Sequence, residues 1–234
     1  MRRALASSRR LAVLAAFVAL ASGLCVQPSR AAPYVVDLGG ARVALDAPAG
    51  FSDTAFIASP RISEIAEALT SASNRILLFA LSDADVRRFT VGDTPELRRY
   101  MLAVTPRGLE RTSVSEQEFS LFVEGALRGL GTPPAGTDYQ AYMDSRPRGQ
   151  PSVLAELRRG PAAVAVIQGT RMPPTTRRAD EPPRYLLSST ALMRIRGRAL
   201  QLSVYSAFNT PDDFDWIRRT TTDWMDDLER LNNR

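Results

Sequence analysis

The sequence predicts an α+β fold in which an antiparallel β-sheet has amphipathic helices packed against it. The predicted elements follow the order two strands, helix, two strands, helix, four strands, helix. The last four strands are joined mostly by short turns, which is typical of an antiparallel meander. Each helix has a single apolar stripe that must be buried against another layer. These observations together favour an α/β sandwich formed by one domain.

The first predicted elements are a hairpin and a helix. Residues 34–38 and 42–45 flank the glycine pair 39–40, which is a strong signal for a tight hairpin turn. The segment 48–51 (Pro-Ala-Gly-Phe) ends the hairpin with turn residues. Ser59 followed by proline then suits the start of a helix. The apolar stripe of this helix comprises Ile62, Ile65, Ala66 and Leu69.

The middle of the chain predicts two buried strands. The apolar run 76–81 is short enough for a buried strand, and residues 98–105, centred on Met101, Leu102 and Val104, are predicted to form the next one. Residues 82–95 between them are polar, and we expect them to be irregular with a short turn around 86–89.

The next helix has a complete N-terminal signal. Ser115 and Glu118 form a capping box. The stripe behind it comprises Phe119, Phe122, Val123, Ala126, Leu127 and Leu130. Residues 132–151 follow as an irregular stretch that carries Tyr139, Tyr142 and Met143. Two interpretations remain open: a surface loop whose aromatic side chains pack back onto the protein, or a binding loop.

Two hairpins and a long helix complete the chain. The strands of these hairpins span residues 153–157, 162–168, 185–196 and 199–208. A proline-rich loop, 172–183, separates the two hairpins and is expected to be exposed. Asn209 or Thr210 can cap the last helix, and Pro211 suits its first position. Its stripe comprises Phe214, Ile217, Thr221, Trp224, Leu228 and Leu231.

The N-terminus predicts export. A basic segment is followed by the uncharged, mostly apolar run 11–24, which is shorter than the roughly 20 residues that span a bilayer. Small residues at Ser29 and Ala31 fit signal-peptidase cleavage after Ala31. We therefore expect residues 1–31 to be a signal peptide, residues 32–234 to be a single domain, and the mature protein to be periplasmic or secreted. The alternative is an uncleaved N-terminal tether.

Missing residue types exclude several chemistries. The chain has no His and no Lys, and its one cysteine, Cys25, lies in the expected signal peptide. The mature chain would thus lack a thiol nucleophile, an imidazole base and a Schiff-base amine. Five of the 30 arginines precede the cleavage site, which leaves 25 basic residues against 25 acids. This balance does not support nucleic-acid binding. We expect no catalytic residues, no metal site, no cofactor and no transmembrane helix after cleavage.

Carboxylate clusters are the remaining candidates for a site. Asp83 and Asp85 follow a buried strand and occupy the best position for one, although no calcium-binding loop spacing surrounds them. Other acidic residues are better explained by the last helix, where Asp226 should pair with Arg230. The first-turn acids of that helix are Asp212, Asp213 and Asp215.

Arginine pairs could bind an anion, but in a chain without lysine they also arise by default. The pairs are Arg87-Arg88, Arg98-Arg99, Arg177-Arg178 and Arg218-Arg219. The densest set surrounds the proline-rich loop and comprises Arg171, Arg177, Arg178 and Arg184. An anionic ligand, if there is one, is expected there.

The order of elements resembles the PsbP-type α/β sandwich, which Mog-type Ran-binding proteins and exported bacterial DcrB-like proteins share. The resemblance depends on the early hairpin that ends at 48–51, the strand pair before the helix at 115–130, and the last hairpin that leads into the helix 211–231. It covers most of residues 34–232. It implies an assembly or binding role and no shared catalytic residues.

We therefore expect an exported, non-enzymatic binding or assembly module with an envelope protein as its partner. The partner would bind a sheet face or the 132–151 loop. The alternative is a small-molecule-binding protein or weak hydrolase that uses arginine and carboxylate groups near Asp83 and Asp85 or near Arg177. The oligomeric state is left open.

Overall fold

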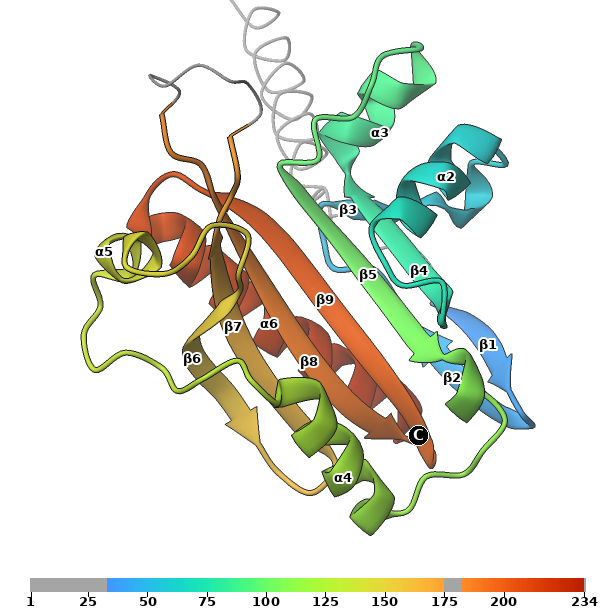
Figure 1. Cartoon of the computed structure of the whole chain (residues 1–234). Coiled ribbons are helices and arrows are strands. Elements are labelled where there is room, and N and C mark those ends of the chain that lie inside the picture. The colour runs from blue at the N-terminus through green and yellow to red at the C-terminus, as the bar shows by residue number, and fades with distance from the viewer. Residues whose placement is uncertain (1–32, 175–181, 234) are drawn as a thin grey trace, which may run out of the picture.

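The computed structural model describes residues 33–174 and 182–233, which form the predicted α+β sandwich. Its centre is a seven-stranded antiparallel sheet with the strand order β3-β4-β5-β9-β8-β7-β6 (Figure 1). The strands are β3 (Phe51–Asp53), β4 (Asn74–Ser82), β5 (Arg99–Pro106), β6 (Ser152–Arg159), β7 (Ala163–Arg171), β8 (Tyr185–Ile195) and β9 (Arg198–Phe208). A separate hairpin consists of β1 (Tyr34–Leu38) and β2 (Ala41–Leu45).

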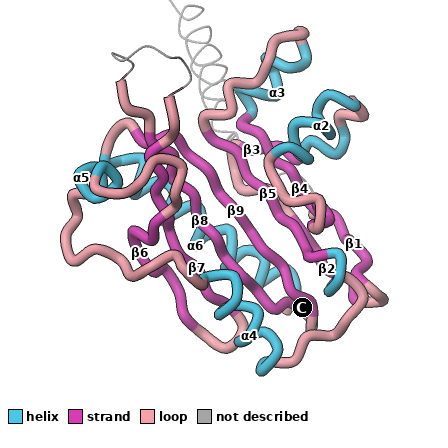
Figure 2. Tube along the Cα trace, viewed as in Figure 1, coloured by secondary structure: helices cyan, strands magenta, loops and turns pink. Residues whose placement is uncertain are grey.

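Helices cover both faces of the sheet, as Figure 2 shows. The described part of the chain contains α2 (Pro60–Ala68), α3 (Asp83–Thr90), α4 (Glu116–Leu127), α5 (Tyr139–Asp144) and α6 (Pro211–Asn232). It also contains two short 3₁₀ helices, η1 (Thr54–Phe56) and η2 (Arg107–Leu109). Helix α6 and the β1–β2 hairpin pack on one face, and α2, α3 and α4 pack on the other.

The largest apolar core lies between the sheet and α6. The predicted stripe of α6 is buried from Phe214 to Leu228, and Trp224 is only 2% exposed. The indole Nε1 of Trp224 donates a hydrogen bond of 2.8 Å to the carbonyl of Asp46, which follows β2. At the end of α6, the side-chain amide of Asn232 pairs with both backbone polar groups of Ala44 in β2. The hairpin is thus held to α6 by apolar packing and by these directed hydrogen bonds.

Two smaller cores lie on the opposite face. One lies beneath α2, where Ile62 and Ala66 pack with Phe79 of β4. The other lies beneath α4, where Phe119 and Val123 pack with Leu192 of β8. The predicted capping box of α4 is confirmed, with the Ser115 and Glu118 side chains each accepting a backbone N–H of the other residue.

Three short elements differ from the sequence prediction. Residues 83–90, predicted to be irregular, form α3, because the Ser82 hydroxyl accepts the Asp85 N–H and caps a polar first turn. Phe51, predicted to end the turn 48–51, begins the edge strand β3. The stretch 132–151 contains the six-residue helix α5.

Two details of the predicted helix faces also differ. Ala126, predicted to lie on the α4 stripe, is exposed. Asp226 was expected to pair with Arg230 on α6, but it pairs with Arg158 of β6, and Arg230 pairs with Asp227. The sheet places Arg158 beside α6, which helical spacing alone does not indicate.

Candidate functional site

The outer edge of β4 is only partly covered by a neighbouring strand. β3 is three residues long and pairs with Ala80–Ser82, so the segment 74–79 has β5 on one side and no strand on its outer side among the described residues. Side-chain hydroxyls bind its outward-facing carbonyls instead. The Thr54 hydroxyl donates to the Phe79 carbonyl at 2.9 Å, and the Tyr34 hydroxyl donates to the Leu77 carbonyl. Such side-chain contacts protect a strand edge without extending the ladder.

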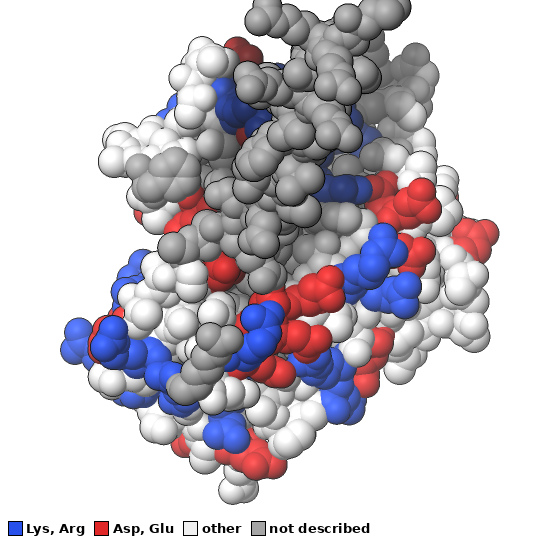
Figure 3. Space-filling view, turned by 180° about the vertical axis from the view of Figure 1, so that it is seen from behind, with Lys and Arg blue, Asp and Glu red and all other residues white. Residues whose placement is uncertain are grey.

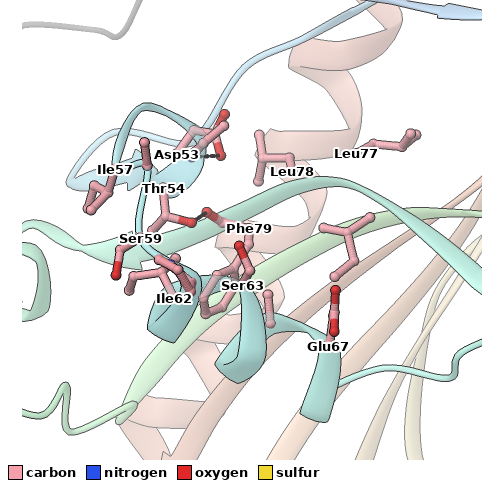
Figure 4. Close-up of a pocket in the computed structure, with 15 residues that line it drawn as sticks. Asp53, Thr54, Ile57, Ser59, Ile62, Ser63, Glu67, Leu77, Leu78 and Phe79 are labelled. Atoms are coloured by element: carbon pink, nitrogen blue, oxygen red, sulfur yellow. Dashed lines mark hydrogen bonds between the residues drawn. The ribbon is translucent and has the colours of Figure 1, made fainter.

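A cavity of about 550 Å³ lies along this edge, between β4 and α2 (Figure 4). Its apolar wall includes Ile57, Ile62, Ala66, Ile76, Leu77, Leu78 and Phe79. Its polar groups belong to Asp53, Thr54, Ser59, Ser63 and Glu67. In Figure 4, Ser63 and Glu67 point from α2 toward β4, and Asp53 lies on the other side of the β4 ribbon. The cavity therefore extends around the strand edge and has walls on both sides of it.

Local sequence explains why the cavity forms. β3 ends at Asp53, whose carboxylate accepts the Ala55 N–H at 3.2 Å and caps η1. The chain then turns at Ser59 and enters α2 with Pro60 at its first position, so α2 lies over the front of β4. The register of the β4–β5 pairing shifts between Ile76 and Leu78, so the regular strand geometry of β4 is interrupted beside the cavity.

The electrostatics of the cavity are acidic. Burial raises the pKa of the Asp53 carboxyl, although backbone N–H groups of Ala55, Phe79 and Thr54 act in the opposite direction. Burial also raises the pKa of the Tyr34 hydroxyl, with a smaller effect from the negative charge of Asp53. Of the described residues that line the cavity, two are acids and none is arginine.

The groove continues beyond the cavity. A second hollow of about 420 Å³ shares Glu67 and Ile76 with the first and extends to Arg75 and Arg107. Arg75 pairs with Glu110, and Arg107 Nε donates to the Ala72 carbonyl at 3.2 Å. We call the two hollows together the β4 edge groove. It has acidic residues at the Asp53 end and basic residues at the Arg107 end.

A separate cleft of about 670 Å³ lies between the start of α5, β6 and the start of α6. Tyr139 of α5 stacks on Phe214 of α6 with ring centroids 4.1 Å apart. Arg218 lies in this cleft and pairs with Asp215 at 2.9 Å. Glu156 also lines it, and a hydrogen bond from Arg159 lowers the pKa of its carboxyl. We call this the α5–α6 cleft.

Two solved structures are similar to the chain at low sequence identity. No family model and no curated protein matches the chain. Among solved structures, it is similar to the Saccharomyces cerevisiae Ran-binding protein Mog1p, with a TM-score of 0.40, 12% identity, and coverage of 85% of this chain and 93% of that one. A mutant of protein Mog1 gives a TM-score of 0.39 at 12% identity, covering 86% and 94%.

The predicted carboxylate site is part of helix α3. The Asp83 carboxylate accepts the Ser52 hydroxyl at 2.8 Å, and the buried Asp85 carboxylate accepts the Glu96 N–H at 2.8 Å. These bonds connect α3 to β3 and to the following loop. In the ranges that the structure describes, no three residues among His, Cys, Asp and Glu are grouped so that they could hold a metal ion.

The arginine pairs are largely divided among separate ion pairs. Arg88 and Arg98 both contact Glu96, whereas Arg99 binds Asp213 and stacks over Trp216 at 4.1 Å. Figure 3 shows basic and acidic side chains interspersed on the reverse side of the molecule.

The structure only partly describes the arginine set around the proline-rich loop. Arg171 lies 3.4 Å from the Asp144 carboxylate, and Arg184 donates to the Pro173 carbonyl. Arg177 and Arg178 lie outside the described residues. The described members of the set therefore bind neighbouring parts of the chain.

The β4 edge groove is not apparent from the sequence. Asp53 has no motif around it, and Tyr34 is 43 residues from the carbonyl that it binds. The available signal was indirect: a turn follows the first hairpin and leaves little room for a long strand beside the apolar run 76–81. The 132–151 loop was identified, and its Met143 and Tyr139 do pack back onto the protein.

Proposed function

We propose that the chain is an exported, non-enzymatic binding or assembly module that acts in the periplasm. Its partner is an envelope protein, part of which lies in the β4 edge groove. The observation that carries this proposal is the groove itself, which combines an open strand edge with a largely apolar wall in its first hollow and polar and charged groups in its second. Export is supported by the basic and apolar N-terminal segments.

Three features support the finer resemblance to PsbP-type and DcrB-like proteins. These are the β1–β2 hairpin, the β4–β5 pair before α4, and the β8–β9 hairpin that continues into α6. We propose that the chain acts as such modules do, through binding. In the part of the chain that the structure describes, no helix is long and apolar enough to cross a membrane.

Photocrosslinking in intact cells tests the proposal. Benzoylphenylalanine replaces Ser63, which lines the groove on α2, or Ser120, which is exposed on α4 and serves as the matched control. We expect adducts with an envelope protein from position 63 and not from position 120. Equal adducts from both positions, or none from position 63, would contradict a partner in the groove.

The α5–α6 cleft supports a second candidate function, the binding of a small molecule. Arg218 lies there with Asp215 and Glu156, so the cleft brings an arginine and carboxylates together. Hydrolysis is less well supported, because a carboxylate with a lowered pKa, such as Glu156, is a weak general base.

A thermal-shift screen with a library of small metabolites tests this second function. A ligand of the cleft should raise the melting temperature of the protein, and Arg218→Ala should abolish the rise. Arg87→Ala, which changes an exposed arginine on α3, is the control. A rise that survives Arg218→Ala would exclude the cleft as the binding site.

A further inference from the structure

We propose that the partner binds the β4 edge groove as an extended segment that adds a strand beside residues 74–79, with apolar side chains toward α2 and a basic side chain beside Asp53. This inference rests on the proposed function, because it specifies the partner of the same groove. It follows from the backbone at the strand edge and from the chemistry on either side of it.

The backbone at this edge already has the geometry that an added strand needs. The carbonyls of Leu77 and Phe79 are two residues apart and both point away from β5, toward the hydroxyls of Tyr34 and Thr54. Outward carbonyls at alternate residues are the acceptors that a neighbouring strand uses. An incoming strand would donate its N–H groups to these carbonyls in place of the two hydroxyls, and at Phe79 the buried Thr54 side chain would have to move aside. Each hydroxyl hydrogen bond would be replaced by a backbone hydrogen bond from the partner, so most of the net affinity must come from the partner's side chains.

The two walls of the groove determine which side chains fit. Successive residues of a strand point to opposite faces. On the α2 side, a side chain would meet Ile62, Ala66 and Ile76, which favour an apolar residue. On the other side, it would approach the half-buried carboxylate of Asp53, and none of the 15 lining residues is an arginine that could neutralise it. A lysine or arginine of the partner would supply that positive charge.

The size of the groove sets the length of the segment. The open part of β4 comprises six residues, 74–79, and strands rise about 3.3 Å per residue, so the edge is about 20 Å long. A segment of about five or six residues would fill it. The other end of the sheet is less suitable, because the β6–β7 pairing is irregular at two places, between Val153 and Ala155 and between Glu156 and Arg158, whereas the open part of β4 has one such irregularity, between Ile76 and Leu78. Such bulges disfavour strand addition.

Fluorescence anisotropy with synthetic peptides tests the inference. The probe is a labelled peptide of about eight residues in which Val and Lys alternate, added to the chain 32–234. Two control peptides are an alternating Val and Glu peptide and the Val–Lys peptide with N-methyl groups at alternate residues, which block backbone pairing. We expect saturable binding of the first peptide and loss of binding for both controls.

Two variants locate the binding site. We expect Asp53→Asn to weaken binding of the Val–Lys peptide by about tenfold, because it removes the charge from one charge-assisted hydrogen bond. Asp223→Asn on the exposed part of α6 should leave binding unchanged. Circular dichroism establishes that both variants are folded.

The outcomes separate this inference from the proposed function. Absence of saturable binding, or binding that tolerates N-methylation or Asp53→Asn, would overturn strand addition. If crosslinks from position 63 persisted in that case, the groove would still hold a partner, but in another form. Loss of the crosslinks as well would overturn both.

Discussion

Gly169 in β7 shows how a missing side chain makes room for another. A Cβ at this position would lie 2.5 Å from the Met143 sulfur and 2.7 Å from Cδ1 of Leu154. Met143 is 1% exposed and holds α5 against the sheet. The absence of a side chain at Gly169 therefore determines how the 132–151 stretch packs.

We expect Gly169→Ala to lower the free energy of unfolding by about 1–3 kcal/mol, because the added methyl group overpacks the contact with Met143. Urea unfolding of the chain 32–234 measures this change. Gly136→Ala is the control, since a Cβ there meets nothing within 4 Å. Equal stability of the two variants would show that α5 shifts without cost.

Arg198 is buried with incomplete hydrogen bonding. It is 8% exposed, and its Nη2 donates to the Gly39 carbonyl at 2.7 Å. Its Nε and Nη1 are buried and have no partner among the described residues. A buried charge with few partners carries a desolvation penalty of several kcal/mol.

We therefore expect Arg198→Met to leave the free energy of unfolding within about 1 kcal/mol of the wild type or to increase it, because apolar packing can replace a poorly paired buried charge. Thermal and urea unfolding measure the effect. A larger loss would mean that the guanidinium is paired more fully than the described contacts indicate.

At the scale of an element, α6 depends on the carboxylate of Asp213. Burial acts to raise the pKa of this carboxyl, but the N–H groups of Asn209 and Thr210 and the side chain of Arg99 together lower it. A carboxyl whose pKa is lower in the folded state stabilises the protein above its unfolded pKa, which is about 3.9. That contribution is lost as the pH falls through the folded pKa.

We expect Asp213→Ala to lower the free energy of unfolding at pH 7 by about 0.5–2 kcal/mol, since it removes a helix cap. The difference from the wild type should begin to shrink below about pH 4, where the unfolded carboxyl takes up a proton, and should be lost as the pH falls through the lower pKa of the folded state. Urea unfolding at several pH values measures this, with Asp212→Ala as the neighbouring control. A difference that is constant down to pH 2 would contradict the charge-based explanation.

Asn232 connects two elements by directed hydrogen bonds. Its Oδ1 accepts the Ala44 N–H at 2.8 Å, and its Nδ2 donates to the Ala44 carbonyl at 2.9 Å. We expect Asn232→Ala to increase hydrogen exchange across residues 34–45 with little change in β8 and β9. Mass-spectrometric exchange measures this, and Asn233→Ala is the control. Unchanged exchange in the hairpin would show that apolar packing alone holds it.

Elements with strong local signals could be predicted from the sequence, and weak or distant ones could not. The capping box of α4 and the stripe of α6 are local patterns, and both were predicted correctly. Helix α3 is not predicted because its polar first turn resembles a loop. Strand β3 is too short to show the alternation of apolar and polar residues that marks a strand. The β4 edge groove depends on strand pairing and on contacts from Tyr34 and Thr54, which no local pattern encodes.

At the scale of the whole molecule, the proposed export predicts where the mature chain begins. The apolar run 11–24 and the small residues at Ser29 and Ala31 predict that the periplasmic protein begins at Ala32. Intact-mass spectrometry of the protein from the periplasmic fraction measures this. A mass that includes Met1 would instead support a membrane tether.

The contact between Asn232 and Ala44 affects the order in which parts of the chain can fold. These residues are 188 positions apart, so the first hairpin emerges long before its anchor exists. A ribosome or a translocation channel releases the N-terminus first. The apolar face of the β1–β2 hairpin therefore stays exposed until α6 has been released and can pack against it. The hairpin can therefore be fully anchored only after the last turn of α6 is released. A chain shortened by a few C-terminal residues would keep its sheet, while residues 34–45 would lose the hydrogen bonds from Asn232 and, of their contacts with α6, keep only those with its earlier part.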